Sequence, residues 1–532
     1  MQRVTNSFYE IIYTFICTLC LLFTGCLFVS AFLNTAYSLD MDSQIVLYRR
    51  DSLVFSLVGI CLFCGFFYIC GKGILKNPGK AKRILLAIVF SLHLGLGLSL
   101  VVFGRTMPAA DAMSVYSIAD AFAMNDTSAI HPTDSYLSYY PQQIGLVSFL
   151  EPILRIFHLF PVSAPAYHLV KCLYVLLVLC IIYFQYKTVH LMFQDDLADC
   201  FYLLLIGMNL PLCVYSSFVY SEIPSFTALS IGLYFLLKFI YADTSVQKRP
   251  SKAAKKTALF IAVVFLAWSV LIRKNSLVII IAVLCVVLAQ WMKEYKNKLL
   301  PVCFVLCLIT CVTILPFVQK LYEFRGHNTL KSGVTATSYF AMGMQEASRG
   351  MGWYNGFNFY TYRDTGMDTE ATNAIAKEAI YDRLSYFKEH PAYAFSFYRQ
   401  KYLSQWTDGT YACRQATLAN GGGRSEFLNA CYVGKYAGGI IRFCNHYQNI
   451  LYLGAFWYCI RMFLKRKERN NRLADWLCLI GVFGGFLFHM LWEANSRYIL
   501  LYGLLLVPYC AGGLSRTLGG FYRRSEGNDA NK

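Results

Sequence analysis

Long windows of uncharged apolar residues recur along this 532-residue sequence. A helix needs about 20 such residues to cross a bilayer, whose core offers no water to an open backbone. The sequence is 57% hydrophobic, whereas soluble domains are about 45–50% apolar. The fold class is therefore an all-α polytopic membrane protein. We expect about twelve transmembrane helices, at 11–33, 53–71, 84–103, 167–186, 200–216, 225–241, 257–272, 276–292, 299–318, 446–464, 473–491 and 498–514.

The short loops between these windows alternate in charge. Basic residues gather at 72–83, 248–256, 293–298, 465–472 and 516–524. The opposite short loops carry only Arg49, Arg50, Arg273, Lys274 and Arg497. Basic loops stay on the cytoplasmic side, so both termini are expected in the cytoplasm and the first span is expected to act as an uncleaved anchor in the cell membrane. The net charge of +18 then reports orientation, and no nucleic acid partner is expected.

Two longer segments are expected to lie outside the cytoplasm. They divide the chain into three spans (1–103), a first outer loop (104–166), six spans (167–318), a lid-like outer segment (319–445), and three spans with a cytoplasmic tail (446–532). No phosphate-binding glycine motif occurs, so a nucleotide cofactor is not expected.

Helical periodicity continues in both outer segments. Apolar residues at helical spacing predict amphipathic, interfacial helices near 113–122 and 144–157 of the first loop. In the second segment, Asp368 is a candidate N-cap for a helix over 369–389. Pro391 fits the first turn of a further helix that runs to about residue 406.

Most of the 20 cysteines lie within the apolar windows, where a cysteine behaves as a small apolar residue. The C-x-x-C pairs at 17–20 and 61–64 have the spacing of zinc ligands but no histidine partners. Cys413 and Cys431 are expected outside the membrane, where a disulfide and two free thiols are both open.

Acidic residues near the outer membrane face are candidates for catalysis. Asp111 follows Arg105 and Pro108 directly after the third span, where it can act as a general base or cap a helix. Asp120 lies nine residues on, on another helix face, and is a weaker candidate. Glu222, in a Tyr-Ser-Glu turn, can face the same cavity as Asp111 or can start a helix before Pro224.

Cations at the same face are candidates for binding phosphate. Arg273 and Lys274 stand together at an outer junction, against the charge trend. A guanidinium matches phosphate oxygens, although a cation can also extend to lipid headgroups. Before the last span, Glu493 and Arg497 are four residues apart and pair if the segment is helical. Alternatively, Arg497 is a second phosphate ligand.

Taken in order, these motifs resemble a known family. They are Pro108-x-x-Asp111, an aromatic run ending in Tyr140-Pro141, Tyr220-Ser221-Glu222, Arg273-x-Asn275, and Asn495-Ser496-Arg497-Tyr498. The order is similar to that of the GT-C superfamily of membrane glycosyltransferases, in particular the protein mannosyltransferase and aminoarabinose transferase group of glycosyltransferase family 39.

The resemblance implies a GT-C-like architecture and an inverting transfer of a sugar. The donor would be a polyprenyl phosphate sugar, and the acceptor an extracytoplasmic cell-envelope glycan, lipid or protein. It assigns Asp111 to catalysis, and Arg273 and Arg497 to the carrier phosphate. Ala112 stands where protein mannosyltransferases carry a second acid, which favours a glycan or lipid acceptor. One clear carboxylate is a poor divalent site, so no metal is expected.

Two other functions stay open. A polysaccharide polymerase or ligase would use a pyrophosphate-linked glycan and differs mainly in its donor. A flippase or transporter of a lipid-linked glycan would carry charged or broken-helix elements at mid-membrane, often in repeated halves. The polar residues of this chain gather at one face instead.

Overall fold

The computed structural model describes residues 2–38, 44–133, 135–160, 166–242, 251–294, 297–418, 424–467 and 472–529. Helices dominate this part of the chain. Within it, 10 helices are long and apolar enough to cross a membrane, namely Phe8–Leu33, Leu53–Lys76, Pro78–Gly104, Ala166–Phe193, Glu222–Tyr241, Lys252–Ile272, Lys274–Lys293, Leu299–Gly326, Leu473–Leu491 and Ser496–Gly520. The predicted all-α polytopic membrane fold is therefore confirmed.

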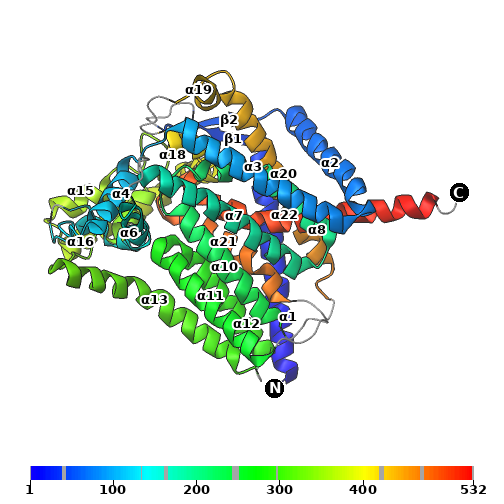
Figure 1. The fold of residues 1–532 in the computed structure, drawn as a ribbon, viewed down its shortest axis with the longest axis horizontal. Helices are drawn as coiled ribbons and strands as arrows, with labels where there is room; N and C mark the ends of the chain where they lie inside the picture. Colours follow the sequence, from blue (N-terminus) through cyan, green and yellow to red (C-terminus); the bar gives the residue numbers. More distant parts are fainter. Residues whose placement is uncertain are drawn as a thin grey trace.

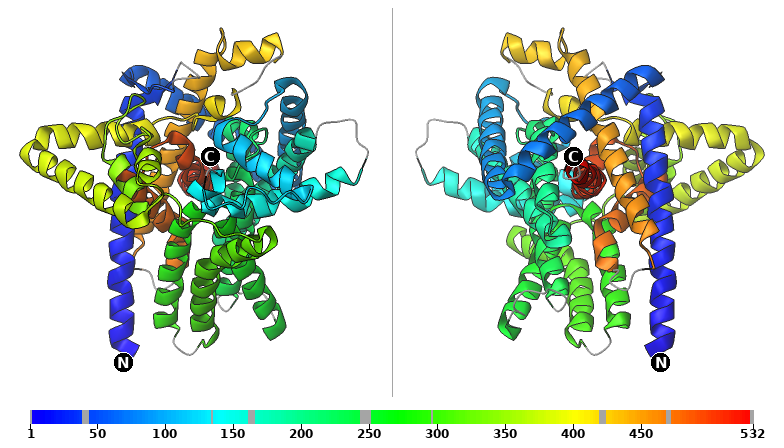
Figure 2. Two further views of the ribbon diagram at one scale, coloured as in Figure 1. Left: turned by 90° about the vertical axis from the view of Figure 1, so that its left-hand side faces the viewer. Right: turned by 90° about the vertical axis from the view of Figure 1, so that its right-hand side faces the viewer.

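The long helices pack side by side in one bundle (Figure 1). They are α1 (Gln2–Leu33), α2 (Leu53–Lys76), α3 (Pro78–Gly104), α7 (Ala166–Phe193), α10 (Glu222–Tyr241), α11 (Lys252–Ile272), α12 (Leu277–Lys293), α13 (Leu299–Gly326), α20 (Ala437–Leu464), α21 (Leu477–Leu491) and α22 (Leu500–Asp529). Helix α10 packs against both α7 and α11, and α20 against both α1 and α22. Figure 2 shows α1 and the green helices α10 to α13 extending toward the same end of the molecule.

Two of the expected spans have a different form. The window 200–216 falls on two shorter helices, α8 (Asp196–Gly207) and α9 (Leu210–Tyr215). They separate at Asn209, whose side chain accepts a hydrogen bond from Leu212 N at 3.0 Å and so starts a new helix. The window 446–464 lies within the longer α20, which buries polar Gln448 and Asn449 among its apolar residues.

Short elements join the long helices. They are α4 (Ala110–Ala123), α5 (Tyr136–Tyr139), η1 (Pro141–Gln143), α6 (Ile144–His158), η2 (Lys274–Ser276), α14 (Ala336–Gly343), α15 (Phe357–Asp364), α16 (Thr369–Glu389), α17 (Pro391–Trp406), α18 (Cys413–Leu418), α19 (Glu426–Tyr432), η3 (Leu473–Trp476) and η4 (Ser496–Ile499). The amphipathic helices of the first loop are confirmed as α4 and α6. Helix α16 begins after Asp368, whose Oδ1 accepts from Ala371 N at 2.8 Å as predicted. Helix α17 begins at Pro391 and ends at Trp406 as predicted.

A β-hairpin between α1 and α2 was not predicted. Strand β1 (Asn34–Tyr37) pairs antiparallel with β2 (Leu47–Arg50), in the register Asn34 opposite Arg50. The hairpin is fixed from outside, because Ala36 N donates to Thr407 O at 3.2 Å. Distant chain therefore completes its hydrogen bonds, and the local sequence gives no sign of this.

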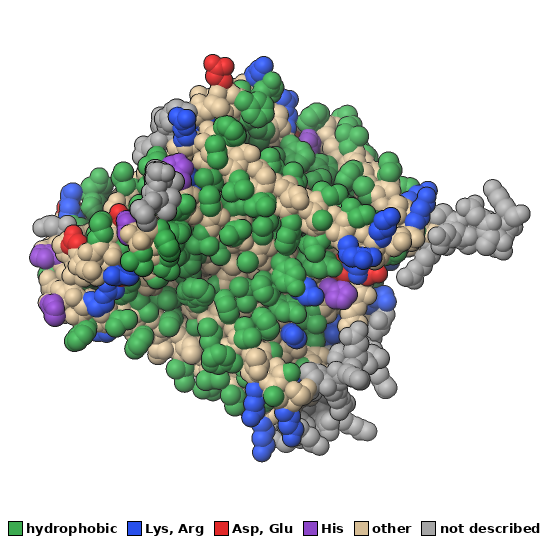
Figure 3. Space-filling view, viewed as in Figure 1, with side chains coloured by type: hydrophobic (Ala, Val, Ile, Leu, Met, Phe, Trp, Pro, Cys, Tyr) green, Lys and Arg blue, Asp and Glu red, His purple; other side chains and the backbone are tan. Residues whose placement is uncertain are grey.

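Parts of the two predicted outer segments lie together. In Figure 1, α4 and α6 of the first segment gather at the left with α15 and α16 of the second. Hydrophobic side chains cover the middle of the same view, and Lys and Arg side chains lie around its edges (Figure 3). Parts of the predicted basic loops 248–256, 293–298 and 465–472 lie outside the described residues. The identity of the outer end stays a prediction from charge.

Candidate active site

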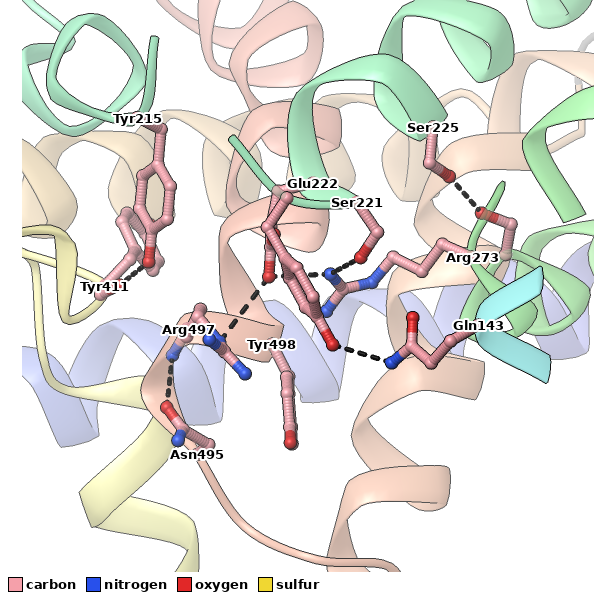
Figure 4. Close-up of polar contacts among 12 residues, drawn as sticks. Gln143, Tyr215, Ser221, Glu222, Ser225, Arg273, Tyr411, Asn495, Arg497 and Tyr498 are labelled. Carbon is pink, nitrogen blue, oxygen red and sulfur yellow. Dashed lines mark hydrogen bonds and ion pairs between the residues drawn. The ribbon is translucent and has the colours of Figure 1, made fainter. Parts of the chain in front are cut away.

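Two arginines converge on one buried glutamate where the long helices meet the outer segments. Glu222 is the first residue of α10 and is 7% exposed. Arg273 Nη1 lies 2.7 Å from Glu222 Oε1, and Arg497 Nε lies 3.5 Å from the same oxygen (Figure 4). Two close guanidinium groups repel each other, so the carboxylate between them is what makes the arrangement stable.

Backbone geometry and serine contacts place Arg273. It ends α11 in an extended conformation, with φ −146° and ψ 107°, and its Nη1 also donates to Ser221 Oγ at 3.0 Å. Ser225 on α10 donates to Ser269 O at 3.0 Å and lies 3.0 Å from Ser276 Oγ. These bonds hold the start of α10 against the junction of α11 and α12 (Figure 4).

A cap and three aromatic rings place Arg497. Asn495 Oδ1 accepts from Arg497 N at 2.9 Å and fixes the start of η4. The guanidinium carbon of Arg497 lies 5.5 to 5.7 Å from the ring centres of Tyr220, Tyr498 and Phe218. Such cation–π contacts stabilise a cation that has left water, so Arg497 stays oriented although it makes only one ion pair with the residues that the structure describes.

A pocket opens beside the two arginines. Its charged and polar lining comes from Glu222, Arg273, Arg497 and Tyr498, and the rest is apolar: Ile223, Phe226, Leu500, Leu501 and Leu504. Within the described chain, neither carboxylate oxygen of Glu222 accepts an aligned hydrogen bond, and Arg497 Nε donates none. Two cations and one anion leave a local charge of +1. The unused Nε–H donor of Arg497 and this positive charge therefore suit an anion that carries an apolar chain.

Asp111 lies close to this cluster from the side of the first outer loop. It is exposed in the first turn of α4, a helix that buries Ala112, Val115 and Ala119. Burial, followed by the charges of Tyr354 and Asp111, raises the pKa of Tyr140 well above its ordinary value. The predicted acid and the predicted aromatic run are thus brought together.

Glu493 is the second carboxyl group near Asp111. It is 8% exposed, and burial raises its pKa to about 7. A hydrogen bond from Tyr498 Oη to Glu493 Oε1 (3.1 Å) and the charge of Arg497 oppose this shift, and the charge of Asp111 adds to it. The interpretation in which Glu493 pairs with Arg497 is wrong: Glu493 precedes η4 in non-helical backbone, and Arg497 pairs with Glu222 instead.

The lid-like segment packs directly on the non-helical stretch of chain that contains Glu493. Ala494 N donates to Gly352 O at 2.7 Å, and Tyr339 stacks on Trp492 with ring centres 5.0 Å apart. Lys401 is fully buried and donates to Gly343 O, and burial lowers its pKa to about 7. Sequence reasoning missed Lys401, because a lysine within an amphipathic helix gives no sign of burial.

Three predicted candidates lie apart from the cluster. Lys274, next to Arg273, is exposed in η2. Arg105 is exposed at the end of α3 with a left-handed φ of 47°. Asp120 pairs with His158 Nε2 at 2.8 Å and so joins α4 to α6. Within the described ranges, none of the three makes an ion pair with Glu222.

The cysteines considered in the sequence analysis carry free thiols. Cys413 and Cys431 are both free thiols, and Cys413 is buried. The C-x-x-C cysteines of the first two spans are free as well.

Gln143 donates to Tyr220 Oη at 2.6 Å and so joins η1 to the turn before Glu222 (Figure 4). No motif distinguished Gln143 in the sequence.

Comparison with known proteins adds a partial likeness of fold. No family model matches the sequence, and no curated protein does. Two similar solved structures are of the oligosaccharyltransferase of Archaeoglobus fulgidus. One is AglB in complex with an inhibitory peptide and a dolichol-phosphate, at 13% identity and a TM-score of 0.42, covering 84% of this chain and 52% of that chain.

The other is the apo form, at 13% identity and a TM-score of 0.44, covering 83% of this chain and 52% of that chain. The present chain thus spans about half the length of both. At these TM-scores we infer no activity from the likeness.

Proposed function

We propose that this protein is a membrane glycosyltransferase that moves a sugar, with inversion, from a polyprenyl phosphate donor to an extracytoplasmic glycan, lipid or protein acceptor. The observation that carries the proposal is the pair Arg273 and Arg497 at the charged end of an apolar pocket. The guanidinium groups suit the phosphate oxygens, and the wall of Leu500, Leu501 and Leu504 suits the first units of a polyprenyl chain.

The charge of the cluster favours one donor class. With Glu222 between the arginines, the pocket carries a net +1. That charge balances the single negative charge of a phosphodiester, whereas a pyrophosphate-linked glycan brings two. This supports a monophosphate donor over the pyrophosphate donor of a polymerase or ligase.

The reaction assigns each polar group a part. Asp111 takes the proton of an acceptor hydroxyl, whose oxygen attacks the anomeric carbon from the face opposite the phosphate. The bond from that carbon to the phosphate oxygen breaks, and its electron pair leaves with the phosphate. Arg273 and Arg497 stabilise the charge that develops there. Glu222 was a predicted catalytic acid. Because Glu222 forms ion pairs with both arginines, we assign it the role of positioning them.

A transfer assay with purified protein in lipid tests the proposal. The donors are radiolabelled polyprenyl phosphate sugars and the acceptor is a crude cell-envelope extract. Asp111→Asn is expected to lower transfer about a thousandfold, because a general base contributes about 10²–10⁴ in rate. Asp120→Asn, on the same helix, is the matched control and retains transfer.

Two outcomes would overturn parts of the proposal. Transfer by Asp111→Asn at the wild-type rate would remove Asp111 from the mechanism. No transfer by the wild type from any monophosphate donor would remove the donor class, and pyrophosphate-linked glycans would be tested next.

A further inference from the structure

A second pocket borders the same turn as the arginine pocket. Ser496 of η4 lines it, whereas the next residue, Arg497, lines the pocket described above. Its other walls come from the β-hairpin, the start of the lid-like segment, α17 and the chain at 408–415. The empty space between its walls is about 280 Å³, but this figure includes open solvent, so only the edge of a ligand fits between them. One short turn therefore connects the two pockets.

The described lining of the second pocket is polar and contains one carboxylate and no cation. None of the described residues that line it is a lysine, arginine or histidine. Its single carboxylate, Asp408, already accepts three hydrogen bonds: Oδ1 accepts from Thr410 N at 2.9 Å and from Thr410 Oγ1 at 2.6 Å, and Oδ2 accepts from Ala412 N at 3.2 Å. The pocket suits neither a phosphate, which requires a cation, nor a metal ion, which requires free carboxylates.

One buried group in this pocket lacks a partner. Gln415 is 8% exposed, and its Nε2 donates to Ser38 O at 3.4 Å. Its Oε1 accepts no hydrogen bond from the part of the chain that the structure describes. A buried acceptor without a donor is costly, and because Gln415 lines the pocket, a donor from outside the chain can reach this residue.

Aromatic rings complete the lining. Tyr37 is half-buried in β1, and Trp353 is held by a hydrogen bond of 3.0 Å from its Nε1 to Ser404 Oγ. Rings offer apolar faces to the C–H groups of a sugar, and a neutral amide and hydroxyls bond to its hydroxyl groups. A neutral saccharide satisfies this described lining of rings, an amide, hydroxyls and a hydrogen-bonded carboxylate without any cation.

We propose that this pocket binds one edge of a neutral sugar that belongs to the acceptor glycan. A hydroxyl group on that edge donates a hydrogen bond to Gln415 Oε1. The inference rests on the proposed function, because it assigns the acceptor side of the same site. It also commits to a glycan among the acceptors named above. Since Ser496 and Arg497 are adjacent, a sugar in this pocket lies one turn of chain from the donor phosphate.

The test measures binding without a donor, so it does not depend on transfer. Wild-type protein in nanodiscs is titrated with the methyl glycosides of glucose, mannose, galactose and N-acetylglucosamine, with glucuronate as the charged comparison, by saturation-transfer NMR. At least one neutral glycoside is expected to bind. Gln415→Leu is expected to weaken it about tenfold, the effect of one lost hydrogen bond.

A second variant and a control make the result decisive. Tyr37→Leu changes a half-buried side chain of the hairpin and is expected to weaken the same glycoside, so it serves even if Gln415→Leu does not fold. Arg497→Ala is expected to lose transfer but to keep glycoside binding. Binding of no neutral glycoside would mean that water alone fills the pocket, and unchanged binding in both variants would place the sugar elsewhere. Either result overturns the proposal.

Discussion

Two clusters in this protein contain the same kinds of side chain and differ in what they leave unfilled. Each has one buried glutamate, two arginines and a tyrosine, and both lie where outer elements meet the long helices. The first is Glu222 with Arg273, Arg497 and Tyr498; the second is Glu151 with Arg155, Arg325 and Tyr322.

The Glu151 cluster is closed. Arg325 donates to both carboxylate oxygens, at 2.9 and 2.7 Å, in the fork geometry that arginine favours. Arg155 Nη2 adds a bond of 3.0 Å, and the hydroxyl of Tyr322 donates as well. These bonds lower the pKa of Glu151 although burial alone would raise it. The saturated carboxylate joins α6 to α13, which is a structural role.

The Glu222 cluster is open. Both of its arginines approach one oxygen, neither carboxylate oxygen has an aligned hydrogen bond within the described residues, and an apolar pocket adjoins them. Charge and residue type are the same in the two clusters. An unused arginine donor next to an apolar pocket therefore distinguishes the Glu222 cluster, which we propose as a binding site, from the structural Glu151 cluster.

Among the changes that compare the two clusters, the largest expected effect comes from conservative replacement of an arginine. Arg497→Lys keeps the charge but removes the fork, and we expect transfer to fall about a hundredfold, the effect of losing one donor to a developing charge. Arg325→Lys in the closed cluster is the matched control and is expected to transfer within a few-fold of wild type. Equal losses in the two variants would show that the clusters do not differ in function.

Helix α6 connects the two clusters, and its first turn tests the open one. A Cβ added at Gly145 would lie 1.7 Å from the backbone oxygen of Leu271, two residues before Arg273. Gly145→Ala must therefore displace α6 or the end of α11. We expect transfer to fall about tenfold, because small misplacements of binding groups slow catalysis.

Gly439→Ala is the control for this change, since no atom lies within 4 Å of its added Cβ. The initial transfer rate of each variant is measured after its folding has been confirmed. Wild-type transfer by Gly145→Ala would mean that Arg273 does not depend on the contact with α6.

Glu151, further along the same helix, tests the closed cluster. Glu151→Gln leaves Arg325 without its carboxylate, and we expect a loss of about 1.5–3 kcal/mol of stability, the usual contribution of a hydrogen bond to a charged group. Thermal unfolding in detergent measures the change. Transfer per folded molecule is expected to stay at the wild-type value; a loss of transfer at an unchanged melting temperature would give Glu151 a functional role.

The smallest expected effect is on the pH dependence of stability. The pKa of Glu493 is raised from 4.5 to about 7, so the folded protein keeps a proton that the unfolded chain releases. Its stabilising contribution is full below pH 4.5 and is lost as pH rises through 7. Glu493→Gln is therefore expected to flatten the fall in melting temperature between about pH 5 and pH 7.

Lys401 does not obscure this window. Its pKa is lowered to about 7, so its contribution changes between that value and its ordinary 10.5. Exposed Glu389→Gln is the control, and its pH profile is expected to match that of the wild type. A profile of Glu493→Gln equal to that of the wild type would contradict the assignment of the titration to Glu493.

Local signals made part of the fold predictable. The limits of α16 and α17 follow from Asp368 and Pro391, because a cap and a proline act on the residues next to them. The hairpin at residues 34–50 was not predictable, since its outer hydrogen bond comes from Thr407. Arg273, Glu222 and Arg497 were recognised as candidates by residue type. The sequence suggested Glu493 as the partner of Arg497, whereas the structure pairs Arg497 with Glu222.

The sequence by itself determined that this chain is a helical membrane protein with acids and arginines at the ends of its spans, because hydropathy and charge act over a single helix or loop. Only the tertiary structure decided that Glu222 is the anion shared by two arginines, that Glu493 lies near Asp111, and that Lys401 is buried. Ion pairing and burial depend on which distant segments of the chain come into contact. A sequence pattern shows which residues could pair, but it does not show which of them lie close together in the fold.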